Sequence, residues 1–286
     1  MKLSIEIGGV LFHFDSDCDI MVEDSIAPFF SIREESCDVS VRLIHDFSAA
    51  PLPTGDKLGE DLLMEFYREG QSLLCMTKRG GGTYLAACLC DQNMRSMTCW
   101  LNFSAASRDN FLGSILRLIP LRRILLTHGV LFLHASQIAV GGTGILFSAP
   151  SGTGKTTQAK LWNRFRGAQI LCNDRTLTDC ARTYGFPVDG SEPVITGERR
   201  ELGAVVILRQ APVNTVRRLR AREAMPLLMS QTVLDVWDGD VQSAASNRML
   251  DLIGKVPVYL LACTPDERAV QCLEQQLWKD GVISHE

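Results

Sequence analysis

The sequence contains no long hydrophobic segment. None of the apolar runs in its 286 residues approaches the roughly 20 residues that a membrane-spanning helix requires. The N-terminal segment MKLSIEIGGVLFHFD lacks the apolar central region of a secretory signal peptide. We therefore expect a cytoplasmic protein with no membrane partner.

An excess of positive charge is also missing. The formal net charge is −4 and the sequence pI is about 5.8, whereas general nucleic-acid binders carry a basic surface. We therefore expect no nucleic-acid partner. The composition does not distinguish a monomer from a homo-oligomer, and both remain open.

Metal-binding cysteine pairs are absent. The sequence has 10 cysteines but no C-x-x-C pair, and no cysteine and histidine pairs have the spacing of zinc ligands. A structural zinc site is therefore not expected. Because the N-terminus predicts no export, we expect these cysteines to be reduced and mostly buried.

Internal repeats and low-complexity tracts are absent as well, and the chain length suits one large domain or two modest ones. Residues 1–105 are rich in β-prone runs, and KRGGG within them predicts a hairpin turn. The segment LGEDLLMEFYREG, residues 58–70, instead predicts a short amphipathic helix. No group of side chains here suggests chemistry, and we expect the isolated His13 and His45 to be structural or exposed. A smaller, strand-rich α+β N-terminal domain is therefore predicted.

Residues 106–286 have the alternating pattern of an α/β domain. RDNFLGSILRLIPLRRILLTHG predicts a helical link with a break at Pro120. Strand and helix patterns then alternate, with strands expected at residues 130–140, 144–149, 168–174, 204–210 and 256–263 and helices at 155–165 and 266–277. The Pro- and Gly-rich segment Tyr184–Gly203 predicts a long loop, and such loops in compact domains are usually functional or mobile.

The strongest signal in the chain is APSGTGKT, residues 149–156. It fits the pattern G-x-x-x-x-G-K-[ST], except that Ala149 replaces the usual first glycine. An apolar strand pattern precedes the segment, a helix pattern follows it, and Gly167 is a suitable end for that helix. This context favours a phosphate-binding loop over a chance glycine-rich turn.

A loop of this kind binds phosphate through its backbone. Glycine N–H groups approach the anion without a side chain in the way, and the helix N-terminus adds partial positive charge. The residues expected to bind ATP and Mg²⁺ are Ser151, Gly152, Thr153, Gly154, Lys155, Thr156 and Thr157. Within this set, Lys155 is expected to reach the β- and γ-phosphates, and the Thr156 hydroxyl is expected to ligate Mg²⁺.

Two positions near the loop carry groups suited to chemistry. Asn173 and Asp174 follow the strand after the loop helix, where neighbouring strand ends face the same phosphates. Asp174 could ligate Mg²⁺ or accept a proton from an attacking hydroxyl, and the alternative is a plain Asn-Asp turn. His134 lies within the strand before the loop. A lone histidine in a strand is more often structural, and strand alternation does not decide its role.

Three segments in this order, LHASQIAV, GILFSAPSGTGKTTQAKLW and ILCND, resemble the HPr kinase/phosphorylase-like group. That group shares its nucleotide-binding core with ATP-dependent phosphoenolpyruvate carboxykinases. Further matches, within residues 126–277, are GSEP, LGAVVILRQAP and VPVYLLACTPDERAV. The resemblance implies a P-loop core of this type in an ATP-binding domain of residues 106–286, and it does not cover the N-terminal domain.

The resemblance also implies roles for single residues. His134 corresponds to a histidine that lies near the transferred phosphoryl group. The strand end after the loop helix usually carries two aspartates, one acting as base and one near Mg²⁺. Asn173-Asp174 departs from this pair, because asparagine cannot take a proton but can still ligate or orient. Glu192 in GSEP is the candidate for a further acidic residue near the metal.

The function implied is phosphoryl transfer from ATP, with Asp174 accepting the proton of the acceptor hydroxyl. The acceptor is expected to be a serine-type hydroxyl on a peptide, a protein or a small molecule. For Arg199 and Arg200, a phosphate or substrate contact and a solvated basic turn remain equally open. The alternative function is a nucleotide-binding accessory or chaperone module of a peptide-modification pathway without phosphotransfer, which the loss of a carboxylate at Asn173 favours.

Overall fold

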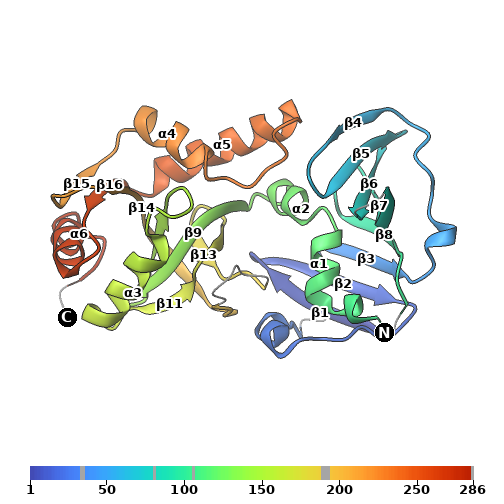
Figure 1. The fold of residues 1–286 in the computed structure, drawn as a ribbon, viewed down its shortest axis with the longest axis horizontal. Coiled ribbons are helices and arrows are strands. Elements are labelled where there is room, and N and C mark those ends of the chain that lie inside the picture. Colours follow the sequence, from blue (N-terminus) through green and yellow to red (C-terminus); the bar gives the residue numbers. More distant parts are fainter. Residues whose placement is uncertain (33–35, 80–81, 105–106, 188–193, 285–286) are drawn as a thin grey trace. The chain divides into compact units, whose positions relative to one another are not determined.

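The computed structural model describes the chain except for residues 33–35, 80–81, 105–106, 188–193 and 285–286. It has a mixed α/β fold with two eight-stranded sheets, and the chain forms two compact units (Figure 1). Unit 1 comprises Met1–His128 and Leu234–Gln242, and unit 2 comprises Gly129–Val233 and Ser243–Glu286. In this division the linking segment up to His128 belongs to unit 1.

Unit 1 is built on a single sheet with the strand order β1-β2-β3-β8-β7-β6-β5-β4. The β2–β3 and β3–β8 pairs are parallel and the other pairs are antiparallel. Its strands are β1 (Lys2–Ile7), β2 (Val10–Ser16), β3 (Val39–Ile44), β4 (Lys57–Glu60), β5 (Met64–Glu69), β6 (Ser72–Arg79), β7 (Thr83–Cys90) and β8 (Ser96–Leu101). Its helices are α1 (Leu112–Leu118) and α2 (Leu121–Thr127), with short 3₁₀ turns at η1 (Asp24–Phe29), η2 (Phe47–Ala49) and η3 (Arg108–Asn110).

The helix predicted for residues 58–70 is wrong, because β4 and β5 occupy this segment. Met64 and Phe66 are buried on one face of β5, which is the two-residue period of a strand. The neighbouring apolar residues Leu62 and Leu63 are 96% and 56% exposed. The apolar cluster at residues 62–64 therefore does not form one helical face, and pairing of β5 with β6 determines the structure.

A buried ion-pair network holds the distant segment Leu234–Gln242 in unit 1. Asp235 is 2% exposed, and its two carboxylate oxygens accept from Arg122 Nε at 2.5 Å and Arg123 Nε at 3.1 Å. The Arg123 guanidinium also lies over the rings of Phe66, at 5.6 Å, and Trp237, at 5.2 Å. Charge pairing and cation–π contact together stabilise this association.

Unit 2 has the strand order β10-β9-β12-β13-β14-β16-β15, with β11 paired to β9 and β10 also paired to β14. The two pairings of β10 close the path β10-β9-β12-β13-β14 into a ring. The strands are β9 (Leu131–Val140), β10 (Thr143–Ser148), β11 (Gln169–Cys172), β12 (Arg175–Thr178), β13 (Arg182–Tyr184), β14 (Arg199–Gln210), β15 (Thr215–Arg218) and β16 (Val258–Cys263). The helices are α3 (Lys155–Arg166), α4 (Ala221–Met229), α6 (Glu267–Lys279) and α5 (Gly239–Lys255), which belongs to unit 2 from Ser243 onward.

Helices cover the unit 2 sheet on both sides. Alternate residues of β14 and β16 pack with the buried faces of α3 and α6 in one apolar cluster, which includes Trp162 and Leu273. The helices α4 and α5 lie on the other side of these strands (Figure 1). Because β10, β14 and β16 run parallel, their carboxyl ends meet at one edge of the sheet, where ligands of α/β proteins usually bind.

Most of the expected elements are confirmed. Strands occur in each predicted β segment of unit 2, helices occur at both predicted positions, and Pro120 separates α1 from α2. Within the predicted loop Tyr184–Gly203, Tyr184 ends β13 and Arg199–Gly203 begins β14, and residues 188–193 lie outside the described residues. The KRGGG turn includes residues 80–81, which lie outside the described residues.

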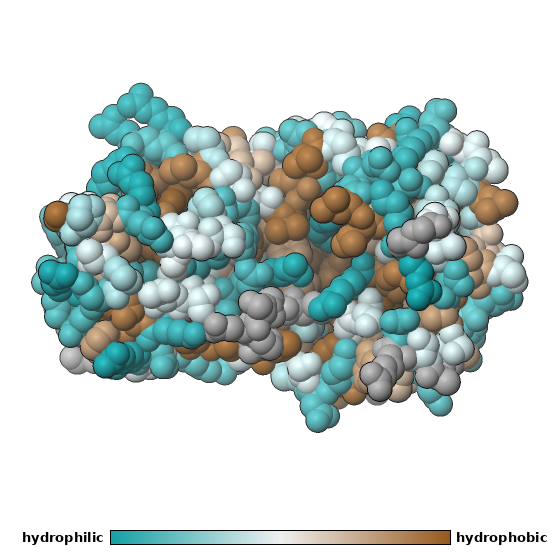
Figure 2. All heavy atoms as spheres, in the orientation of Figure 1, coloured by the Kyte–Doolittle hydropathy of each residue, from teal (hydrophilic) through white to brown (hydrophobic). Residues whose placement is uncertain are grey.

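Figure 2 shows one face of the molecule coloured by hydropathy. Hydrophilic residues cover much of the face in Figure 2, and apolar residues form several separate groups on it, as is common for proteins. Among the described residues, no helix combines the length and the apolar character needed to cross a membrane. The large apolar side chains that are exposed are Met1, Phe30, Ile32, Leu52, Leu62, Leu63, Val213, Leu227, Val236 and Leu250.

Candidate functional site

The glycine-rich loop connects β10 to α3 as the sequence predicts. β10 ends at the buried Ser148, and α3 begins at Lys155. Gly152 and Gly154 have φ angles of 77° and 115°, a region that side chains with a Cβ rarely adopt. Nothing lies within 4 Å of a Cβ built on Gly152, so backbone conformation, not space, requires glycine there.

Ala149 is the one departure from the usual loop pattern, and its surroundings explain why alanine is tolerated there. The residue is 0% exposed and packs in the apolar cluster that contains Ala159 and Trp162. Its position is therefore a wall of the core and not a surface turned toward a ligand. A methyl group fits this wall, so alanine in place of glycine leaves the loop geometry intact.

Lys155 lies inside the loop and not in solvent. Its residue exposure is 7%, and its Nζ donates to the Ala149 carbonyl at 2.8 Å and to the Pro150 carbonyl at 3.5 Å. Burial lowers the pKa of the Lys155 ammonium, and the negative charge of Asp174 opposes this shift. The field of Asp174 therefore reaches the cation of the loop.

The loop and the start of α3 fit a phosphate group. The helix has 12 residues and no acidic residue in its first turn. Its first N–H groups lack intrahelical acceptors and carry the positive end of the helix dipole. Gln210 Nε2 donates to the carbonyls of Gly152 and Thr153, at 3.3 and 3.4 Å, which orients this part of the loop.

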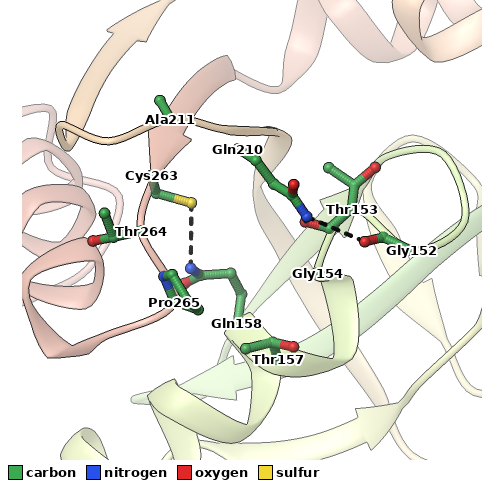
Figure 3. Close-up of a pocket in the computed structure, with 10 residues that line it drawn as sticks. All are labelled: Gly152, Thr153, Gly154, Thr157, Gln158, Gln210, Ala211, Cys263, Thr264 and Pro265. Atoms are coloured by element: carbon green, nitrogen blue, oxygen red, sulfur yellow. Dashed lines mark hydrogen bonds between the residues drawn. The ribbon is translucent and has the colours of Figure 1, made fainter.

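A cleft of about 530 Å³ lies beside the loop at the carboxyl ends of β14 and β16 (Figure 3). It is lined by Gly152, Thr153, Gly154, Thr157, Gln158, Gln210, Ala211, Cys263, Thr264 and Pro265. Gln158 Nε2 contacts Cys263 Sγ at 3.4 Å, and burial raises the pKa of this thiol to about 11. The cleft has the size of a small-ligand site and adjoins the phosphate-binding loop, so it can hold the remainder of a nucleotide.

The Asn173–Asp174 bend is fixed from both sides by β9. Ser136 Oγ donates to the Asn173 carbonyl at 2.5 Å, and the Ala135 N–H donates to the Asp174 carbonyl at 3.0 Å. β11 ends at Cys172 and β12 begins at Arg175, and both strands pair with β9. These hydrogen bonds to the carbonyls of the bend position the carboxylate of Asp174 beside this strand.

His134 and Asp174 form a side-chain pair. His134 Nε2 lies 2.8 Å from Asp174 Oδ1, and the two side chains are 30% and 35% exposed. A carboxylate only accepts hydrogen bonds, so the Nε2 proton lies on the histidine. Asp174 Oδ2 remains available and lies 3.8 Å from Arg175 Nε.

A second hollow, of about 310 Å³, opens beside this pair. It is lined by His134, Asp174, Arg175, Ser230, Gln231, Thr232 and Val233. The wall formed by residues 230–233 is anchored to β9, because the His134 N–H donates to the Gln231 carbonyl at 2.8 Å and the Val233 N–H donates to the Phe132 carbonyl at 2.8 Å. The carboxylate thus faces a defined pocket.

The structure brings some sequence candidates together and separates others. His134, Asp174 and Lys155 are linked by the contacts and the electrostatic effect described above, and Thr156 is half-buried in the first turn of α3. Arg200 lies at the start of β14. The glycine-rich loop lies near the other end of β14, because Ser148, just before the loop, pairs with Ile207. Arg200 instead pairs with Glu198. Glu192 lies outside the described residues.

Several residues at the site had no sequence signal strong enough to find them. Gln158, Gln210 and Cys263 come from three different elements and meet only in the folded cleft. Arg209 lines a further hollow with Ser151 and Gly152. Arg175 follows Asp174 directly, and this adjacency is the one signal that could have identified it.

Comparisons with known proteins give limited information. No family model matches the chain, and none of the curated proteins matches it. Among solved structures, the chain is similar to the Hpr(Ser) kinase/phosphatase from Coxiella burnetii, with 13% identity and a TM-score of 0.30 over 52% of this chain and 93% of that chain. A similarity this loose carries no argument about function, which rests on the geometry of the site.

Proposed function

We propose that the protein is an ATP-dependent kinase of the HPr kinase-like type, with its P-loop core in unit 2. It transfers phosphate to a serine-type hydroxyl on a peptide, a protein or a small molecule. The observation that carries this proposal is the 2.8 Å contact of His134 with Asp174, at the edge of an open pocket. A protein that only holds a nucleotide has no need for such a pair.

The proposed nucleotide site is the loop Ser151–Thr157 with Lys155 at its centre. Backbone N–H groups and the Lys155 ammonium bind the phosphates, and the cleft beside Gln158 holds the nucleoside. Thr156 and Asp174 are the candidate ligands of Mg²⁺, which when bound supplies positive charge to the phosphates. No role is assigned to Glu192.

The proposed reaction forms a bond between the acceptor oxygen and the γ-phosphorus of ATP and breaks the bond from that phosphorus to the β–γ bridging oxygen. ADP leaves, and the hydroxyl proton passes to Asp174 Oδ2. His134 holds Oδ1 and so orients the carboxylate, while Asn173 positions it through the backbone contact with Ser136. This division of roles follows general acid–base catalysis.

A second candidate is a nucleotide-binding accessory or chaperone module without phosphotransfer. The observation that favours it is Asn173, a buried amide next to the single carboxylate of the bend. In this case the protein binds ATP but consumes none. The wild-type baseline therefore separates the two candidates.

The experiment is steady-state ATP consumption by the wild-type protein, with and without a pool of hydroxyl acceptors. A kinase shows turnover that increases with the acceptors, and ATP affinity is measured in parallel by calorimetry. Tight ATP binding without turnover, under a broad acceptor pool, contradicts the kinase and supports the accessory module.

A further inference from the structure

Most hydrogen-bond donors in the wall of the pocket beside His134 and Asp174 already have partners within the protein. The backbone N–H groups of its wall are all used, because those of Ser230, Gln231, Thr232 and Val233 donate to carbonyls of neighbouring residues. The hydroxyls of Ser230 and Thr232 also donate to carbonyls, those of Leu227 and Leu228. The hydroxyl oxygens of Ser230 and Thr232 can still accept hydrogen bonds, and the side-chain amide of Gln231, which donates to Ser230 Oγ at 3.1 Å, is the remaining donor group of this wall.

Arg175 supplies the cation of this pocket. It lies directly opposite His134 in the pairing of β12 with β9, so both side chains are on the same face of the sheet. Its side chain is 45% exposed, and its ionic contact among the described residues is Asp174 at 3.8 Å. This distance is longer than a hydrogen bond, and the guanidinium retains donors for a ligand.

The position of Arg175 relative to Asp174 limits what it can bind. A hydroxyl that reaches Asp174 Oδ2 places the neighbouring part of the same molecule next to the guanidinium. A guanidinium pairs most strongly with a planar oxyanion, through two parallel hydrogen bonds. The anionic group therefore lies within a few bonds of the reacting hydroxyl.

We propose that the acceptor is a hydroxyl compound that carries a carboxylate close to the hydroxyl, and that Arg175 binds this carboxylate. The proposal rests on the proposed phosphotransfer function and names the substrate class of the same site. The carboxylate can belong to a small hydroxy acid or to an acidic residue next to a serine in a peptide. Arg175 is a positioning and specificity residue and takes no proton.

The first test measures binding and does not depend on turnover. Calorimetry compares 3-hydroxypropanoate with its neutral counterpart 3-hydroxypropanamide, and acetyl-Ser-Asp-amide with acetyl-Ser-Asn-amide, in the presence of Mg²⁺ and a non-hydrolysable ATP analogue. The wild type is expected to prefer the carboxylate of at least one pair by roughly tenfold, the typical effect of a charge-assisted contact. The pair that shows the preference identifies the source of the carboxylate.

The variants assign this preference to one residue. Arg175→Gln is expected to abolish it, and Arg175→Lys to retain part of it, because lysine keeps the charge but not the planar fork. Arg182→Gln, an exposed arginine of β13 paired with Glu201, is the matched control and keeps the full preference. No carboxylate preference in the wild type, or a preference that survives in Arg175→Gln, overturns the proposal.

A second measurement tests whether Arg175 contacts the acceptor or the phosphates of the nucleotide. Arg175→Gln is expected to leave the affinity for the ATP analogue unchanged. A loss of this affinity assigns Arg175 to the phosphates and overturns the proposal. Arg175-dependent carboxylate binding without phosphate transfer refutes only the proposed kinase function, and transfer without carboxylate preference refutes only the present inference.

Discussion

His45 in unit 1 and His134 in unit 2 both hydrogen-bond an aspartate, but their surroundings differ. Both ring nitrogens of His45 are used, Nδ1 by Asp17 at 2.7 Å and Nε2 by Asn110 at 2.8 Å, and the side chain is 3% exposed. His134 is 30% exposed and lines a pocket. The first histidine completes a structural network, whereas the second leaves capacity for a ligand.

The same difference extends to the charged groups of the two units. Arg122 and Arg123 of unit 1 close a network with the buried Asp235. Ligand atoms of Asp17, Cys18 and His45 lie within 4.8 Å of one another, but the protein uses both nitrogens of this histidine. Polar groups that satisfy each other stabilise a fold, and polar groups that face a pocket with open capacity can do chemistry.

The largest effect is expected from the matched substitutions Asp174→Asn and Asp235→Asn. Asp174→Asn removes the proton acceptor, so phosphate transfer falls on the order of a hundredfold or more, while the nucleotide still binds through Lys155 and the loop amides and the fold stays stable. Asp235→Asn breaks a buried ion-pair network and lowers the free energy of unfolding by about 3 kcal/mol. Transfer assays and urea denaturation measure the two effects.

Loss of stability in Asp174→Asn together with loss of transfer in Asp235→Asn would contradict the difference that we describe between the two units. A near wild-type transfer rate in Asp174→Asn means that the proton acceptor lies elsewhere. An unchanged unfolding midpoint in Asp235→Asn means that the ion-pair network of unit 1 does not contribute to the free energy of unfolding.

The next effect concerns the two lysines Lys155 and Lys57. Lys155→Ala removes the loop cation, and ATP affinity is expected to fall roughly tenfold to a hundredfold, the equivalent of a charge-assisted phosphate contact. Lys57→Ala in unit 1 removes a surface lysine paired with Glu60 and Glu65 and leaves ATP affinity unchanged. Calorimetric titration with Mg-ATP is the measurement, and equal affinities in both variants contradict the proposed loop function.

A smaller effect is expected from the histidine pair. His134→Gln removes the hydrogen bond that orients the carboxylate of Asp174. The transfer rate is expected to fall roughly tenfold, as it does when an orienting partner is lost at comparable sites. His45→Gln leaves the rate unchanged and lowers stability by about 1–3 kcal/mol, because buried polar partners lose their bonds. Loss of transfer in His45→Gln, with the fold intact by circular dichroism, refutes the assignment of His45 to structure.

The smallest effect is expected for Asn173→Asp, and it is an effect on thermal stability. This residue is 6% exposed, and a carboxylate there is destabilising unless a cation neutralises it. The melting temperature is therefore expected to fall without divalent ions and to recover when Mg²⁺ is added. The wild type serves as control, and a melting temperature that does not respond to Mg²⁺ in the variant argues against a metal site at this bend.

Local patterns predicted much of unit 2 correctly. The loop between β10 and α3 follows from glycines at two positive-φ positions, and Gly167 ends α3 in the left-handed conformation. These features depend on residues adjacent in the chain, so the sequence carries them directly.

Features that depend on distant contacts were not predicted. Residues 58–70 form strands because β5 pairs with β6, although the local apolar cluster suggested a helix. Arg123 retains residues 234–242 in unit 1 from more than a hundred positions away. Gln158 and Cys263 meet in the cleft in the same way. No periodicity in a single segment encodes such pairings.

The most direct test of the proposed kinase is transfer of labelled γ-phosphate from ATP to the hydroxyl acceptor pool, with wild type and Asp174→Asn compared at saturating nucleotide. Calorimetry first establishes that both proteins bind ATP. The account predicts a labelled phosphoester with the wild type and a loss on the order of a hundredfold or more with Asp174→Asn. Equal transfer by both proteins, or tight ATP binding by the wild type with no labelled acceptor, would contradict it.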